Sequence, residues 1–253
     1  NDFGSGDNNN FDLIDHPVAP GSTQPSSPWP LVDAAYFSTL GITLLEGRLF
    51  TPADTGGPAP VILVSRSWAR RYFPEGTAVG RKLVSGGCVS CPLTTIIGVV
   101  SDVRYNGLDR SPEAVYGPLS EGWQRDLNLF LRTADAPAEL QITGGGATIT
   151  MQPHTVLRFG GKDGNSKIAV ELGAIDLAGN GLVGLDIGDV RLKSGRVRVT
   201  SKGQGAQLSL EMGDASVSPL KGEAFDMVIG SIVDLNQGEV GIESLPDGLM
   251  SKH

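Results

Sequence analysis

The chain has 253 residues, of which 40% are hydrophobic and 19% are charged, and its net charge at pH 7 is −8. This is the composition of a globular protein rather than of a disordered one. The acidic balance argues against a nucleic-acid partner, because a phosphate-binding face needs clustered Lys and Arg. The longest apolar run, around residues 95–100, is far shorter than the roughly 20 residues that a bilayer requires. We therefore expect membrane contact only through segments absent from this chain.

The composition changes near residue 135. All three Trp, all four Tyr and both Cys precede that point, whereas all four Met and 20 of the 35 Gly follow Arg132. A single core would normally contain large aromatic residues from the whole chain, so the change predicts two domains, although a fusion of unrelated pieces would leave the same mark. We expect a Gly-, Pro- and Asn-rich segment over 1–30, an α+β domain over 31–138 and an all-β domain over 139–253.

Helices and strands are mixed in the first half. Asp33 stands where an N-cap would, Phe37 and Leu40 have helical spacing, and Gly41 follows as a stop signal. A second helix is expected at residues 66–73, with Ser65 as its cap and with Trp68 and Tyr72 facing inward. The apolar runs predict strands at 42–45, 60–64, 81–84, 94–103, 114–116 and 127–132. This mixture indicates an α+β domain of the split βαβ type.

The second half consists of short runs that alternate between apolar and polar residues. Each run has five or six residues and is bounded by Gly, Asp or Asn: 147–151, 155–159, 167–172, 195–200 and 207–212. Such a pattern is typical of an all-β sandwich or a short β-solenoid. The glycines of residues 179–184 have dinucleotide-binding spacing, but turn and strand residues follow them, so a structural turn is favoured.

Several segments of the first half resemble one family when they are taken in order. They are Val32–Ile42, Leu45–Phe50, Ala69–Pro74, Val79–Arg81, Ile96–Arg104 and Pro112–Tyr116. Over about residues 1–138 this succession resembles the periplasmic core domain of MacB/FtsX-type permeases. The resemblance implies a non-enzymatic module between two transmembrane helices, which moves when a cytoplasmic ATPase hydrolyses ATP. The chain departs from that pattern, because no membrane helix flanks the domain and Gly144–Gly146 replace the expected final helix and strand.

The second half resembles a FecR-like β-domain over about residues 142–245. The segments that carry the resemblance are Leu192–Val199, Gly222–Val228 and Leu235–Ile242. Such domains repeat a strand, a Gly turn and a strand, since Gly allows the positive φ of a tight turn, and this makes Gly195, Gly222 and Gly238 structural turn candidates. Glu223 stands where the family usually carries Thr. The resemblance implies binding of a partner protein or of cell-envelope material rather than catalysis.

The two cysteines, Cys88 and Cys91, could form a local disulfide in an oxidising compartment. Redox activity would need a helix N-terminus at the first cysteine, and zinc would need more ligands than the dispersed His16, His154 and His253 supply. Two free thiols remain an alternative. No metal site or cofactor is expected.

Four residues are candidates for contact with a partner: Arg66, Trp68, Arg70 and Trp123. Arg and Trp are common interface anchors, although an amphipathic helix with a buried Trp and solvated Arg explains the same pattern. No pairing of a nucleophile with a base is evident, so an enzyme is not predicted. We expect a periplasmic or extracellular module for protein interaction or mechanotransmission. The alternative is a structural subunit that self-assembles through β edges into a filament or surface layer.

Overall fold

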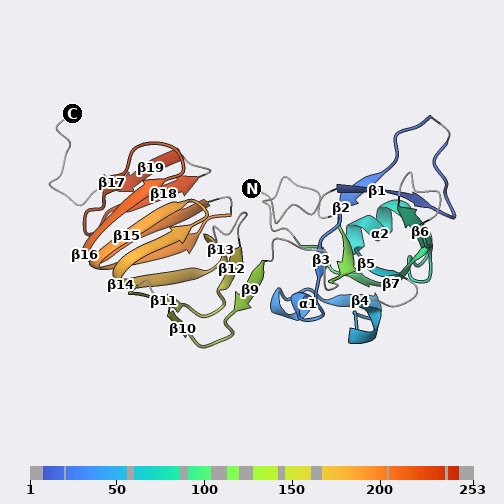
Figure 1. The fold of residues 1–253 in the computed structure, drawn as a ribbon, viewed down its shortest axis with the longest axis horizontal. Helices are drawn as coiled ribbons and strands as arrows, with labels where there is room; N and C mark the ends of the chain where they lie inside the picture. The colour runs from blue at the N-terminus through green and yellow to red at the C-terminus, as the bar shows by residue number, and fades with distance from the viewer. Residues whose placement is uncertain are drawn as a thin grey trace. The chain divides into compact units, whose positions relative to one another are not determined.

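The computed structural model describes most of the chain. The described residues are 8–19, 21–55, 60–85, 91–103, 113–119, 128–141, 146–160, 167–203, 205–236 and 239–244. The chain divides into two compact units, each with its own sheet (Figure 1). The first unit comprises Asn1–Arg104 and Leu108–Arg125, and the second comprises Tyr105–Gly107 and Asp126–His253.

The first unit is a mixed sheet with two short helices, in the strand order β2-β1-β6-β7-β5-β8-β3, and with β4 paired to β7. Its strands are β1 (Asn8–Leu13), β2 (Ser26–Pro28), β3 (Leu31–Val32), β4 (Leu44–Gly47), β5 (Val61–Ser65), β6 (Lys82–Ser85), β7 (Thr94–Val100) and β8 (Val115–Pro118). The helices are α1 (Ala35–Thr39), α2 (Arg66–Tyr72) and the 3-10 turn η1 (Pro52–Asp54).

The centre of this sheet is the parallel pair of β5 and β7, and the chain runs from the first to the second through α2 and β6. A split βαβ unit would place another strand between the two parallel strands. Here β5 and β7 are direct neighbours, because the intervening β6 pairs with β7 on its other side. The α+β expectation therefore holds for the elements of the first unit, but the split arrangement is not the one observed.

Both helices begin and end where local chemistry predicts. The Oδ1 atom of Asp33 accepts the Tyr36 N–H at 2.8 Å, and Gly41 follows α1 with a φ of 70°, a conformation that glycine adopts without strain. The Oγ atom of Ser65 accepts the Trp68 N–H at 3.3 Å at the start of α2. The inner face of α2 is anchored by Trp68, which is fully buried.

The second unit is entirely β in its described part. Its strands are β9 (Leu129–Arg132), β10 (Ala138–Gln141), β11 (Ala147–Met151), β12 (Val156–Gly160), β13 (Lys167–Leu172), β14 (Ala174–Leu185), β15 (Gly188–Ser201), β16 (Gly205–Pro219), β17 (Phe225–Asp226), β18 (Ile232–Asn236) and β19 (Glu239–Ser244). They form one sheet in the order β19-β18-β16-β15-β14-β13-β12-β9, with β11 on β14, β10 on β11 and β17 on β16.

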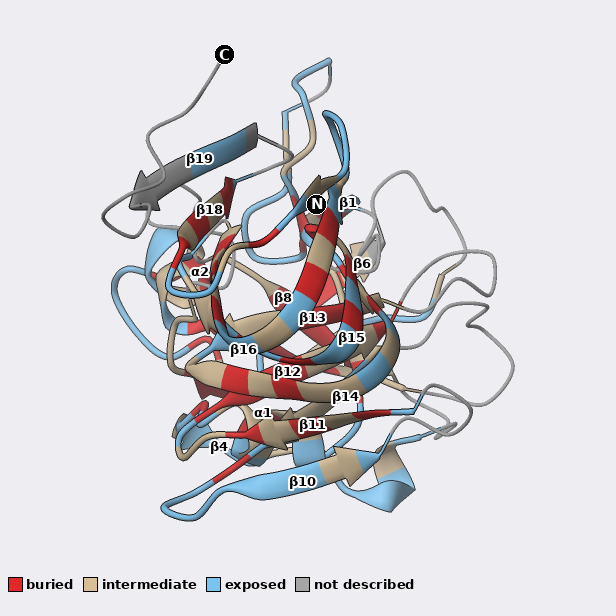
Figure 2. Ribbon diagram, turned by 90° about the vertical axis from the view of Figure 1, so that its left-hand side faces the viewer, coloured by how far each residue is buried: buried red, intermediate tan, exposed pale blue. Residues whose placement is uncertain are grey.

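Three long strands organise this sheet around one core. The first half of β14 pairs with β11, and its end pairs with β13, so the two parts of the strand have different neighbours. Buried and exposed positions alternate along β15 and β16 (Figure 2). Bulges near Ser194 and between Glu211 and Gly213 shift this alternation by one residue, which keeps the apolar side chains on the same face of the sheet. The strands thus form one hydrogen-bonded sheet around a single core, which confirms an all-β unit but not specifically a sandwich or solenoid.

The structure divides the chain earlier than the sequence suggested. We expected β9 in the first domain and a boundary at residues 138/139. Instead, β9 pairs with β12, with Leu129 opposite Phe159, and the units divide between Arg125 and Asp126. The physical reason is packing, because Leu131 of β9 and Leu140 of β10 lie against the core of the second unit.

Candidate functional site

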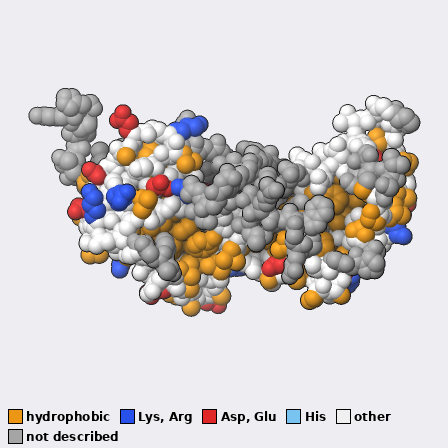
Figure 3. Space-filling view, viewed as in Figure 1, with side chains coloured by type: hydrophobic (Ala, Val, Ile, Leu, Met, Phe, Trp, Pro, Cys, Tyr) orange, Lys and Arg blue, Asp and Glu red, His pale blue; other side chains and the backbone are white. Residues whose placement is uncertain are grey.

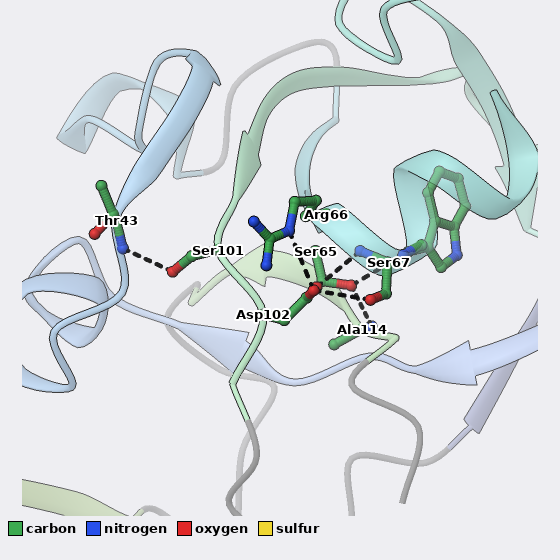
Figure 4. A network of polar contacts seen from close by, with 8 residues as sticks. Thr43, Ser65, Arg66, Ser67, Ser101, Asp102 and Ala114 are labelled. Carbon is green, nitrogen blue, oxygen red and sulfur yellow. Dashed lines mark hydrogen bonds and ion pairs between the residues drawn. The ribbon is translucent and has the colours of Figure 1, made fainter. Parts of the chain in front are cut away.

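A group of polar side chains lies at the carboxyl ends of β5 and β7. Because these strands are parallel, the residues that follow them meet at one edge of the sheet, where α2 begins. The group, which we call the Asp102 cluster, consists of Ser65, Arg66, Ser67 and Asp102 (Figure 4). It connects elements that are distant in the sequence.

Asp102 is the centre of the cluster. Its Oδ1 atom accepts the Ser67 N–H at 2.7 Å, and its Oδ2 atom accepts the Ser67 hydroxyl at 2.8 Å. The Nε atom of Arg66 lies 3.4 Å from Oδ2. The carboxylate is mostly buried, with 16% of its side chain exposed. It therefore satisfies a free N–H in the first turn of α2 and places a negative charge beside the positive end of the helix.

Ser65 and Ser101 extend the network to neighbouring elements. The Ser65 hydroxyl is fully buried and accepts the Ala114 N–H at 3.0 Å, and the Ser65 N–H donates to the Ala114 carbonyl at 2.9 Å. The Ser101 hydroxyl accepts the Thr43 N–H at 3.0 Å. As a result α2, β5, β7, the residue before β8 and the residue before β4 are held together.

The contacts of the Asp102 cluster hold neighbouring elements together and do not activate a reacting group. Both serine hydroxyls are engaged with backbone or carboxylate groups, and the described contacts include no His that could act as a base. Within the described residues, no group of three or more His, Cys, Asp or Glu could hold a metal ion. A hollow in the second unit, lined by residues such as Lys193 and Asp226, has a volume of about 190 Å³, which is smaller than the roughly 300 Å³ at which ligand pockets begin.

The outward face of α2 carries three arginines that differ in their partners. Arg66 is paired with Asp102, and Arg71 donates to Glu113 at 2.8 Å, a bond that raises the pKa of the Arg71 guanidinium. Arg70 is exposed and has no ion pair among the described residues. Among the three arginines of this face, Arg70 is the one whose charge is most available to another molecule.

The expected site residues do not form one site. Trp68 lies in the core, 5.3 Å from the ring of Phe11 and 4.7 Å from that of Tyr72, so it cannot serve as a surface contact. Trp123 lies outside the described residues. Asp102 and Ser67 were not singled out from the sequence, although an aspartate two residues after a buried parallel strand is a signal that could have found Asp102.

The cysteines and the selected glycines have separate structural roles. Cys91 is disulfide-bonded, whereas Cys88 lies outside the described residues, so their pairing stays a prediction. Gly195 was expected at a turn but lies inside β15, beside its bulge, because the strand continues through this position. Gly222 has a φ of 106° after β16. Gly238 lies outside the described residues.

Comparison with known proteins gives the chain a family. The family described as the MacB-like periplasmic core domain matches residues 17–143. No curated protein matches the chain in sequence. Among solved structures, the periplasmic region of MacB from Actinobacillus actinomycetemcomitans is 19% identical and has a TM-score of 0.34, over 44% of each chain.

Two other solved structures are similar to a comparable share of the chain. The extracellular domain of the noncanonic ABC-type transporter YknZ from Gram-positive bacteria is 16% identical, with a TM-score of 0.31, over 44% of this chain and 50% of that one. A candidate anti-sigma factor from Parabacteroides distasonis is 14% identical, with a TM-score of 0.34, over 46% of this chain and 60% of that one. The chain thus spans less than two thirds of the length of each.

Two further observations concern the cellular compartment in which the chain lies. In the described part, no helix is both long enough and apolar enough to cross a membrane. The disulfide-bonded state of Cys91 fits an oxidising compartment such as the bacterial periplasm. Since the family match covers half of the sequence, the chain belongs to the MacB-like periplasmic core domain family and is periplasmic.

Proposed function

We propose that the chain is a non-enzymatic extracytoplasmic module of an ABC-type permease. In this proposal the first unit passes movement between the membrane parts of the permease and a protein partner. Membership of the MacB-like periplasmic core family supports the permease setting. The polar groups described above support a role in coupling rather than in catalysis.

The observation that carries the proposal is the Asp102 cluster. A unit that transmits displacement must move as one body, because the displacement is lost where one element shifts against its neighbour. Asp102 and Ser65 connect the start of α2 to β5, β7 and the residue before β8 through hydrogen bonds of 2.7–3.3 Å. These bonds would make α2 follow the central strands.

We assign the partner contact of the first unit to the outward face of α2. Arg70 is exposed there without an ion pair in the described part, and Arg66 is half-exposed beside it. An uncompensated guanidinium on a helix face is suited to a carboxylate of another protein. Trp123 is not used in this assignment.

The second unit is assigned a separate binding role. Its sequence motifs resemble a FecR-like β-domain, and its described part is one connected sheet in which exposed positions alternate with buried ones along β15. We infer that this unit binds a partner protein, while the first unit couples that binding to the permease.

Hydrogen–deuterium exchange on the full-length permease in membranes, with and without ATP, tests the coupling role. The amides of β5, α2 and β7 should exchange slowly and to the same extent in both states, whereas segments that join the unit to the rest of the permease should change. The Asp102→Ala variant should raise exchange in α2, and the matched Asp15→Ala variant should not. An ATP-dependent change centred on α2 in the native protein would contradict a rigid coupling body.

A second candidate function is self-assembly through sheet edges into a filament or surface layer. Leu129 lies on the edge strand β9 and is 60% exposed. Apolar side chains gather on the lower part of the second unit in Figure 3, around β10, β11 and β12. Exposed apolar edges favour pairing with another chain. Static light scattering decides this candidate: a mass that is constant over a hundredfold range of concentration excludes it, and ordered polymers support it.

A further inference from the structure

The outward face of β15 carries a row of four cations, with exposed Ser194 between the second and the third. Arg191, Lys193, Arg196 and Arg198 are all exposed, and they are four of the 20 Lys and Arg residues in the chain. The alternate positions, such as Leu192 and Val197, are buried. The bulge after Lys193 is what keeps all four cations on one face, since without it the last two would turn toward the core.

Three of these cations form no ion pair in the described part of the chain, although Asp214 of β16 lies opposite Lys193. Arg198 is held by Asp176, with its Nε and Nη2 atoms at 2.8 and 3.1 Å from the carboxylate oxygens. By contrast, Arg191, Lys193 and Arg196 form no ion pair within the described residues. We call these three residues the β15 cation row.

Exposed apolar side chains border the row on both sides. Across the sheet, Arg191 is opposite Leu182 of β14, and Arg196 is opposite Met212 of β16. These two apolar side chains are 47% and 56% exposed. A row of unpaired cations with apolar borders, in a chain of net charge −8, is complementary to a ligand that is both acidic and rich in aliphatic groups.

The geometry of the row favours an extended peptide. Successive outward positions of a strand are roughly 6.6 Å apart, and an extended peptide repeats its side chains at the same distance. Acidic residues at every second position of such a peptide would therefore match the row. A lipid surface fits less well, because three cations in a line along one strand match a single extended chain rather than a two-dimensional array of headgroups.

We propose that the β15 cation row binds an extended acidic segment of a partner protein, with Leu182 and Met212 packing against its backbone and aliphatic stems. This inference names the partner chemistry of the second unit and so rests on the binding role proposed above. The coupling role of the first unit does not depend on it.

Fluorescence anisotropy with the purified chain tests the row directly. The probe is a labelled octapeptide in which Glu and Thr alternate, and the reference peptide has the same composition with its Glu residues in one block. The wild-type chain should bind the alternating peptide more tightly than the block peptide. The Arg191→Gln/Lys193→Gln/Arg196→Gln variant should bind it about tenfold more weakly or worse, since each exposed charge pair contributes a few-fold in affinity.

The matched control removes three other exposed cations of the second unit, as Arg132→Gln/Lys202→Gln/Lys221→Gln. It changes the net charge equally and should keep binding within about twofold. Equal losses in both variants, equal binding of both peptides or no binding by the wild type would overturn the proposal. Binding to phosphatidylglycerol vesicles in place of the peptide, lost in the row variant, would overturn it in favour of a lipid surface. Urea midpoints of the variants confirm that each is folded, and the exchange experiment on the permease tests the coupling role independently.

Discussion

Asp102 makes three of the contacts that hold α2 to the central strands, with the Ser67 N–H, the Ser67 hydroxyl and Arg66. Asp102→Asn should lower the free energy of unfolding by about 1–3 kcal/mol, because an amide cannot accept both Ser67 bonds with the same strength. Urea unfolding of the chain measures this.

Asp15→Asn is the matched control. Asp15 also pairs with an arginine, Arg81, at 2.8 Å, but both side chains are 40% exposed or more, so the loss should be below about 0.5 kcal/mol. Equal losses in the two variants would show that the buried position of Asp102 has no special effect.

Asp54 should make stability depend on pH in acid. Two bonds from Arg48, at 2.7 and 2.8 Å, and the Thr51 N–H at 2.7 Å hold the pKa of Asp54 well below its usual range. A lowered pKa in the folded state stabilises the protein above the unfolded value of roughly 4, and this contribution is lost as the pH falls through the folded value. Asp54→Asn should therefore cost about 1 kcal/mol at pH 7 and clearly less at pH 3. Urea midpoints at both pH values check this, and a cost that does not change with pH would refute the assignment.

At the scale of single elements, Gly195 allows β15 and β16 to approach each other closely beside their bulge. A Cβ atom at this position would lie 2.6 Å from the Asp214 carbonyl oxygen of the neighbouring strand. Gly195→Ala should therefore lower the free energy of unfolding by about 1–3 kcal/mol, since the two strands must move apart. Gly241→Ala in β19 is the control: its Cβ would meet nothing closer than 3.9 Å, so its cost should stay within about 0.5 kcal/mol. Equal thermal midpoints for both variants would argue against the close approach.

The same positions explain what the sequence could and could not predict. The caps of α1 and α2, at Asp33 and Ser65, were predictable because they depend on neighbouring residues. The alternating runs at 195–200 and 207–212 were predicted as strands of six residues. They are parts of the longer strands β15 and β16. A glycine beside a bulge and a glycine in a turn look alike in sequence, and only the pairing of the strands distinguishes them.

The Asp102 cluster was beyond sequence reasoning for a related reason. Asp102 is 35 residues from Ser67, and the parallel pairing of β5 and β7 brings them together. Arg66 and Arg70 were recognised as surface residues, but the ion pair that Arg66 forms with Asp102, and that Arg70 lacks in the described part, depends on that same long-range contact. Trp68 was assigned both to the core and to a contact surface, and its complete burial decides between the two.

At the scale of the whole molecule, we assign coupling and binding to two units that fold separately. The family match extends to residue 143, yet β9 and β10 complete the sheet of the second unit. Leu131 and Leu140 of these strands pack against the second core, and losing them would expose that core. The change of composition near residue 135 therefore falls inside the second unit rather than at its border.

The most direct measurement compares urea unfolding of three fragments, 1–125, 126–253 and 139–253. The first two should each unfold in one cooperative transition, with midpoints close to those of the same units in the whole chain. The third lacks β9 and the first residue of β10 and should be at least about 2 kcal/mol less stable than the second, or unfolded, because the packing of Leu131 against the core is lost. If 139–253 were as stable as 126–253, or if 1–125 and 126–253 folded only when joined, the division into separate coupling and binding units would be wrong.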